Sequence, residues 1–106
     1  MDIAATKVAE VIILAREIDR AEREFDQFVA ALNEDEQAAL VAVFWIGRGS
    51  FGADEYAEAF ETALAEATAP TQEYLKGSPH LADHLESGLE ALGVDSSEVE
   101  DDLYRA

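Results

Sequence analysis

The feature that most constrains this chain is an apolar run over residues 38–46, which ends abruptly in Gly47-Arg48-Gly49. The run is too short to cross a bilayer, and its apolar residues would occupy every face of a helix. This pattern is typical of a helix that is buried on all sides. We therefore expect the other segments of the chain to pack around it.

The rest of the chain has the pattern of an all-α protein. Alanine, glutamate and leucine dominate, and no stretch keeps the alternation of a half-buried strand. At 106 residues the chain has the length of one domain. We predict a compact bundle of about five helices over residues 1–93. An acidic tail over residues 94–106 follows, with Val99 and Leu103 spaced for a short docked helix.

Residues 5–32 carry an apolar stripe at three- and four-residue spacing, which predicts one long N-terminal helix. At 1.5 Å per residue this helix would be roughly 40 Å long, whereas a domain of this size is about 30 Å across. The helix must therefore bend or break, or another chain must cover part of it. The excess length predicts a homodimer through this first helix.

Capping residues and glycines mark the other helix boundaries. Asn33 and Glu36 have the spacing of a capping box, so the central helix should begin there and end at Gly47. Gly88 would let the last helix approach a neighbour closely. The remaining helices are expected over residues 54–68, 71–77 and 79–92.

The charge of the chain is strongly negative. It has 24 acidic and 7 basic residues, for a formal net charge of −17. Nucleic acids and anionic membranes are polyanions, so we expect no general attraction to either. The charge is also uneven, at −3 over residues 1–32 and −14 over residues 33–106. Solubility or salt adaptation, a basic protein partner, and an acidic decoy for a nucleic-acid-binding protein are the interpretations left open.

The cellular compartment is indicated by two absences in the sequence. There is no cysteine, which suits a reducing cytoplasm and removes every thiol chemistry. The apolar segments are too short for a membrane span, and the N-terminus lacks the pattern of a signal peptide. We predict a cytoplasmic protein.

The loop Gly47-Arg48-Gly49-Ser50-Phe51-Gly52 matches the G-x-G-x-x-G pattern letter for letter. In dinucleotide-binding proteins this loop follows a strand, but here it follows a helix. A tight corner between two helices, in which Arg48 pairs with carbonyls or a carboxylate, is therefore the simpler interpretation. An anion-binding site formed by Gly47, Arg48 and Gly49 stays an alternative.

His80 and His84 lie one helical turn apart, which suits two ligands of one metal ion. With Asp83 between them they are similar to the H-x-x-E-H pattern of some metalloproteases, although aspartate has a shorter reach than glutamate. No third ligand motif follows. Two histidines on a helix surface are the competing interpretation of a metal site at His80 and His84.

No catalytic constellation is evident in the chain. Phe44, Trp45 and Phe51 have the character of a pocket lining, but we expect them in the core. The carboxylate clusters at residues 34–36 and 98–102 fit a solvated helix face, because adjacent helical residues diverge. The sequence therefore predicts no catalytic residue and no cofactor.

Four short blocks stand out between residues 33 and 93. They are Glu36-Gln37-Ala38, then Phe44-Trp45-Ile46-Gly47-Arg48-Gly49, then Glu73-Tyr74-Leu75 with Gly77, and Leu81-Ala82-Asp83 with Glu86 and Gly88-Leu89. Together they resemble a bacterial domain family of unknown function. The resemblance implies a small, soluble, helical bacterial protein and supplies no activity.

These observations predict a non-enzymatic protein-interaction or regulatory module. The excess helix length, the uneven charge and the lack of a catalytic constellation favour it. The alternative is a metal- or anion-binding sensor or enzyme that uses His80 and His84, or the loop from Gly47 to Gly52.

Overall fold

The described part of the chain, residues 1–67 and 70–94, forms helices and no strands in the computed structural model, which confirms the all-α prediction. Apart from Val94, the predicted acidic tail lies outside these residues. None of the described helices combines the length and the apolar character needed to cross a bilayer. The elements are α1 (Ala5–Arg16), α2 (Ile18–Ala31), α3 (Glu34–Arg48), the 3-10 turn η1 (Ala53–Glu55), α4 (Tyr56–Ala65), α5 (Thr71–Lys76) and α6 (Leu81–Ala91).

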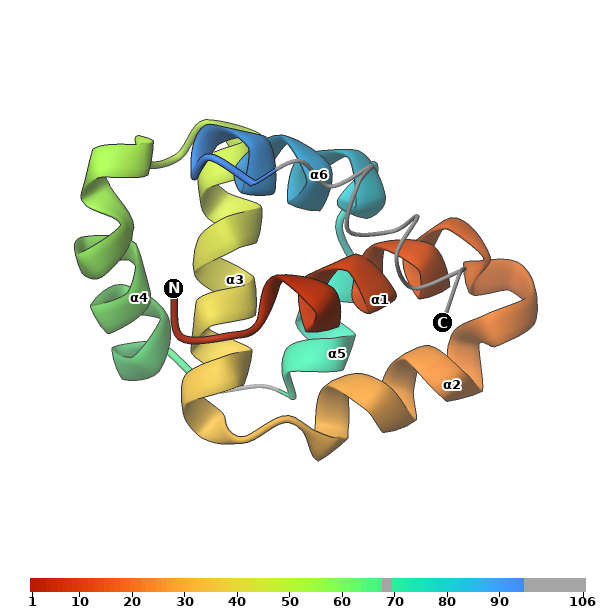
Figure 1. The fold of residues 1–106 in the computed structure, drawn as a ribbon. Helices are drawn as coiled ribbons and strands as arrows, with labels where there is room; N and C mark the ends of the chain where they lie inside the picture. Colours follow the sequence, from red (N-terminus) through yellow and green to blue (C-terminus); the bar gives the residue numbers. More distant parts are fainter. Residues whose placement is uncertain (68–69, 95–106) are drawn as a thin grey trace.

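Helix α3 is the central element, as its apolar sequence predicted. Figure 1 shows α4 along one side of it and α6 across its C-terminal end. Helix α5 also contacts α3, while α1 packs against α6 and α2. The buried residues of α3 cover every face of the helix: Ala38, Ala39, Leu40, Val41, Ala42, Val43, Phe44 and Ile46.

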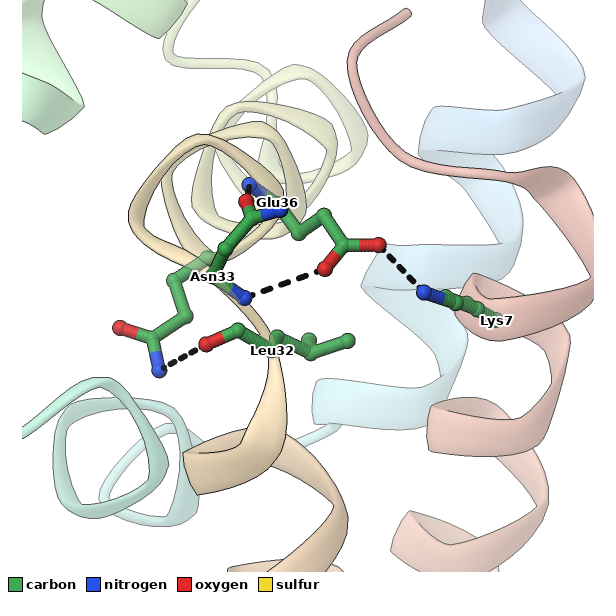
Figure 2. A network of polar contacts seen from close by, with 5 residues as sticks. Lys7, Leu32, Asn33 and Glu36 are labelled. Carbon is green, nitrogen blue, oxygen red and sulfur yellow. Dashed lines mark hydrogen bonds and ion pairs between the residues drawn. The ribbon is translucent and has the colours of Figure 1, made fainter.

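The start of α3 is fixed by the predicted capping box (Figure 2). The Glu36 backbone N–H donates to the Asn33 side chain at 2.8 Å, and the Asn33 N–H donates to the Glu36 carboxylate at 3.1 Å. The second carboxylate oxygen of Glu36 pairs with Lys7 of α1 at 2.5 Å. Glu36 therefore caps α3 and ties it to α1 at the same time.

The end of α3 lies beyond the predicted stop at Gly47. The helix continues through Gly47 to Arg48, and Gly49 takes the left-handed conformation with φ of 91°. The Gly49 N–H donates to the Ile46 carbonyl and the Ser50 N–H donates to the Trp45 carbonyl. These two bonds form a Schellman cap, so Gly49 is the residue that ends the helix.

Gly47 has a different role, which is a close helix crossing. A Cβ atom on Gly47 would lie 1.6 Å from the His84 carbonyl oxygen of α6. A Cβ atom on Gly88 would lie 2.1 Å from the Val43 carbonyl oxygen of α3. Real atoms do not approach so closely, so α3 and α6 meet backbone to backbone and only glycine fits at either position. The close approach expected of Gly88 is confirmed.

The predicted N-terminal helix is not continuous. Its helical conformation breaks at Glu17, with φ of −107° and ψ of 24°, and again at Ala21. The molecule extends over 34 × 28 × 24 Å, which leaves no room for a straight helix of the expected length. The break lets α2 turn back along α1, so that Phe25 and Val29 are buried in the same core as the apolar face of α1.

Helix α5 is held on α2 by the partly buried cation of Lys76. The Lys76 ammonium lies 2.9 Å from Glu22, 2.8 Å from Asp26 and 3.3 Å from Glu73. Hydrogen bonds to Asp26 and Glu22 raise the pKa of Lys76 above its ordinary value of 10.5. With Leu75 buried beside it, this cluster fixes the position of α5.

Substitution of Gly88 tests the close crossing. Gly88→Ala should destabilise the protein by about 3 kcal/mol or more, because the added methyl group forces α3 and α6 apart. Chemical denaturation measures this change. Gly77→Ala is the matched control, since its Cβ would meet only ordinary contacts at 3.5 Å. Equal stability of the two variants would contradict the backbone contact.

The Glu36 pairing predicts a pH dependence. The Lys7 hydrogen bond is the main cause that lowers the pKa of Glu36 below 4.5. The ionised Glu36 side chain should therefore stabilise the fold at pH values above 4.5. This contribution to stability should be lost as the pH falls through the lowered pKa of Glu36 in the folded protein. The stability difference between the wild type and Glu36→Gln, measured by urea unfolding, should shrink on acidification. Asp35→Asn is the control, because it removes a neighbouring charge that does not contact Lys7. If the stability difference between the wild type and Asp35→Asn shrank equally on acidification, the pH dependence could not be assigned to the Glu36–Lys7 pair.

Candidate functional site

A groove of about 700 Å³ lies between α3, α5 and the C-terminal end of α4. Its apolar lining is built largely from small side chains that do not fill the space between the helices. A volume of this size is typical of binding sites. The small apolar residues that line it are Ala30, Ala38, Val41, Ala63 and Ala67.

Two aromatic residues form one end of the groove. The Trp45 Nε1–H donates to the Tyr74 hydroxyl at 2.8 Å, which joins α3 to α5. The Trp45 ring stacks on the Phe51 ring with their centroids 5.7 Å apart. The Tyr74 and Phe44 rings meet edge to face with their centroids 6.2 Å apart. Tyr74 is 40% exposed, an unusual fraction for a large apolar residue among the described residues. The aromatic end is therefore both fixed in position and open to solvent.

Gln37 fixes the middle of the groove. Its side-chain amide donates to the carbonyls of Val29 and Leu32, at 3.0 and 3.1 Å, and so satisfies the last turn of α2 (Leu32 is drawn in Figure 2). Its carbonyl oxygen accepts a hydrogen bond from the Thr71 hydroxyl at 3.3 Å. One residue thus links α2, α3 and α5, which limits the movement of the groove walls.

The groove is acidic at its other end. Glu34 begins α3 and Glu66 follows the end of α4, and both line the groove. These two ends meet because α3 and α4 run in opposite directions (Figure 1). Among the described residues no lysine or arginine lines the groove, and none occurs between Gly49 and Leu75 in the sequence. The groove therefore combines an aromatic end with a negatively charged end.

The residues of the predicted anion site, Gly47, Arg48 and Gly49, each make contacts within the fold. Gly47 faces α6, and the Gly49 N–H is used in the helix cap. The Arg48 Nε donates to Ser50 at 3.0 Å, and its guanidinium lies 4.9 Å from the centre of the Phe44 ring. The negative end of the α3 dipole also disfavours an anion here. This geometry fits the helix corner, and anion binding stays a prediction.

His80 and His84 lie close together at the start of α6. The rings of His80 and His84 are 6.5 Å apart, and Asp83 lies 4.0 Å from the exposed His80. His80 has a φ of 59°, so α6 begins at Leu81 and residues 78–79 form a turn instead of a helix start. Over residues 1–67 and 70–94, no group of three or more potential ligands surrounds a metal position. A metal site at His80 and His84 stays a prediction.

The aromatic residues expected in the core divide between core and groove. Phe44 is fully buried, as expected, but Trp45 and Phe51 are only partly buried, and Trp45 lines the groove. Tyr74 and Gln37 were not predicted to be parts of a site, although both line the groove. The contact of Tyr74 with Trp45 spans 29 residues and leaves no local signal.

The Trp45 hydrogen bond can be tested directly because the chain has one tryptophan. Tyr74→Phe removes the acceptor and should cost about 1 kcal/mol of stability. It should also shift the single indole N–H resonance in NMR spectra and speed its exchange with water. Tyr56→Phe is a control that leaves the groove intact. An indole resonance that is unchanged in Tyr74→Phe would contradict this contact.

The groove and the glycine crossing lie within a region that matches a known family. A family model described as a protein of unknown function, DUF3775, matches residues 22–94, which is more than half of the chain. No curated protein matches the chain, and neither does any solved structure. The matched region extends from α2 to the end of α6 and contains every residue that lines the groove. The chain therefore belongs to the DUF3775 family of proteins of unknown function.

Proposed function

We propose that this protein is a non-enzymatic interaction module that binds a basic partner protein. The observation that carries this function is the uncompensated acidity around α4. From η1 to the end of α4 the chain has four acidic residues, Asp54, Glu55, Glu58 and Glu61, and no basic one. Glu66 and the groove follow directly. A basic surface would be attracted to this side of the molecule.

The internal ion pairs strengthen this asymmetry. Lys7 is paired with Glu36, and Lys76 is surrounded by carboxylates of α2 and α5. Lys7 belongs to α1 and Lys76 belongs to α5, and both cations pair with carboxylates that lie outside α4. Neither Lys7 nor Lys76 pairs with a carboxylate of η1 or α4 in the described residues, which supports an attraction of these carboxylates to charges outside the chain.

The polar groups of the groove also favour binding over catalysis. The Trp45 indole is bonded to Tyr74, and the Gln37 amide is bonded to backbone carbonyls. A catalytic nucleophile needs an adjacent general base, and none of these groups forms such a pair. Their hydrogen bonds instead hold a surface in one shape, which lowers the entropic cost of binding a partner.

The homodimer through the first helix stays a separate prediction. Its original reason was the excess length of a continuous helix, and the break at Glu17 removes that reason. The buried face of α1, which includes Val8 and Ile12, packs within its own chain. Light scattering over a range of protein concentrations decides between monomer and dimer.

Affinity capture tests the proposed function. The immobilised full chain, mixed with a lysate of its source organism at about 0.1 M salt, should retain basic proteins. Raising the salt to about 1 M should release them, because the Debye length falls from about 10 Å to about 3 Å. An unrelated protein of similar size and net charge is the control.

Two other outcomes are informative. Capture of the same proteins by the control, or capture that ignores salt, would contradict the proposed function. Release of the partner by duplex DNA, but not by polyglutamate at the same concentration of negative charge, would identify it as a nucleic-acid-binding protein and would favour the narrower role of an acidic decoy.

A further inference from the structure

We infer, on the basis of the proposed function, that the groove between α3, α4 and α5 is where the partner docks. Its occupant is a basic amphipathic segment that carries an apolar anchor side chain at one end and lysine or arginine at the other. The two different ends of the groove define this chemistry.

The apolar anchor is specified by the aromatic end. Trp45 and Tyr74 present ring surface beside small residues such as Val41 and Ala63. A leucine or phenylalanine side chain can enter the space that the alanines leave and contact both rings. Aromatic residues with a polar tip are enriched at the centre of protein interfaces, where an anchor fills a pocket.

The basic end of the segment is specified by Glu34 and Glu66. Both carboxylates line the groove, and within residues 1–67 and 70–94 no basic residue lines it with them. A partner carboxylate there would meet like charges, whereas lysine or arginine would be attracted. Charge complementarity therefore sets the direction in which the segment lies.

The length of the segment follows from α3. Glu34 and Trp45 lie on the same groove-facing side, about three turns apart, which is roughly 16 Å along the helix axis. An extended peptide rises about 3.3 Å per residue, so about five residues separate the anchor from the basic group. The groove thus fits a short linear segment.

Trp45 makes this site measurable, because the single tryptophan of the chain lies in the groove. The probe is a synthetic peptide with the sequence Leu-Phe-Ser-Gly-Ser-Lys-Lys and blocked ends. Titrating it into the full-length protein should change the Trp45 fluorescence in a saturable way. A peptide with glutamates in place of the lysines, or serines in place of Leu-Phe, should bind at least about fivefold more weakly.

Charge variants locate the basic end. The double variant Glu34→Gln/Glu66→Gln should bind the probe about fivefold more weakly. The double variant Glu24→Gln/Glu90→Gln loses the same charge from exposed positions on α2 and α6 outside the groove, and should bind within about twofold of the wild type. Equal losses in the two variants would overturn the groove as the docking site while leaving general attraction to basic partners intact.

A steric variant tests whether the peptide occupies the groove. Ala67 lines the groove and is exposed, so Ala67→Leu should fold normally and reduce binding more than about tenfold. Ala57 is exposed on α4 away from the groove, and Ala57→Leu is the control. Circular dichroism confirms that both variants are folded. Equal binding by the two variants would overturn the inference.

Two further results would also overturn it. One is the absence of any saturable change in Trp45 with the probe, and the other is a change caused by concentrating the protein alone, which would assign the groove to a second copy. The affinity capture separates these failures from failure of the proposed function. Salt-sensitive capture of a basic partner that persists in Ala67→Leu would preserve the interaction role and reject only the groove.

Discussion

The backbone contact between α3 and α6 determines how the other helices are arranged. Gly47 and Gly88 let two helix backbones touch where side chains would normally separate them. This close crossing fixes α6 across the C-terminal end of α3, while α4 lies along one side of α3 (Figure 1). The groove lies between α3, the end of α4 and α5.

The groove depends on a contrast in packing. Large side chains such as Phe44, Leu85 and Leu89 fill the core completely. On the groove side, alanines of α3 and α4 line the space, and its aromatic end is open to solvent. Gln37 and Lys76 hold α5 in place by polar contacts, so the groove does not collapse to bury its apolar lining. The groove is thus kept open because polar contacts fix the helices around it, while its small side chains do not fill the space between them.

The features that could be predicted from the sequence are local ones. The capping box of Asn33 and Glu36 is a spacing of three residues, and the buried α3 is one continuous apolar run. The break at Glu17 could not be located, because neither proline nor glycine marks it and the apolar stripe continues past it. Tertiary packing of Phe25 decides that turn.

Gly47 illustrates a second limit of structure prediction from sequence. A glycine near the end of a helix has the same appearance whether it caps the helix or lets another helix approach. Only the position of α6 separates the two roles, and that position depends on contacts distant in sequence. The groove was hidden for the same reason, since alanines in a helix indicate helix propensity and say nothing of the space beside them.

The bond between Trp45 and Tyr74 gives the groove a chemical polarity of its own. An indole N–H can only donate, so the Tyr74 hydroxyl acts as the acceptor in this bond and keeps its own proton for another acceptor. Accepting one hydrogen bond also strengthens a hydroxyl as a donor. Tyr74 can therefore offer its proton to a main-chain carbonyl, an acceptor that a peptide of any sequence carries.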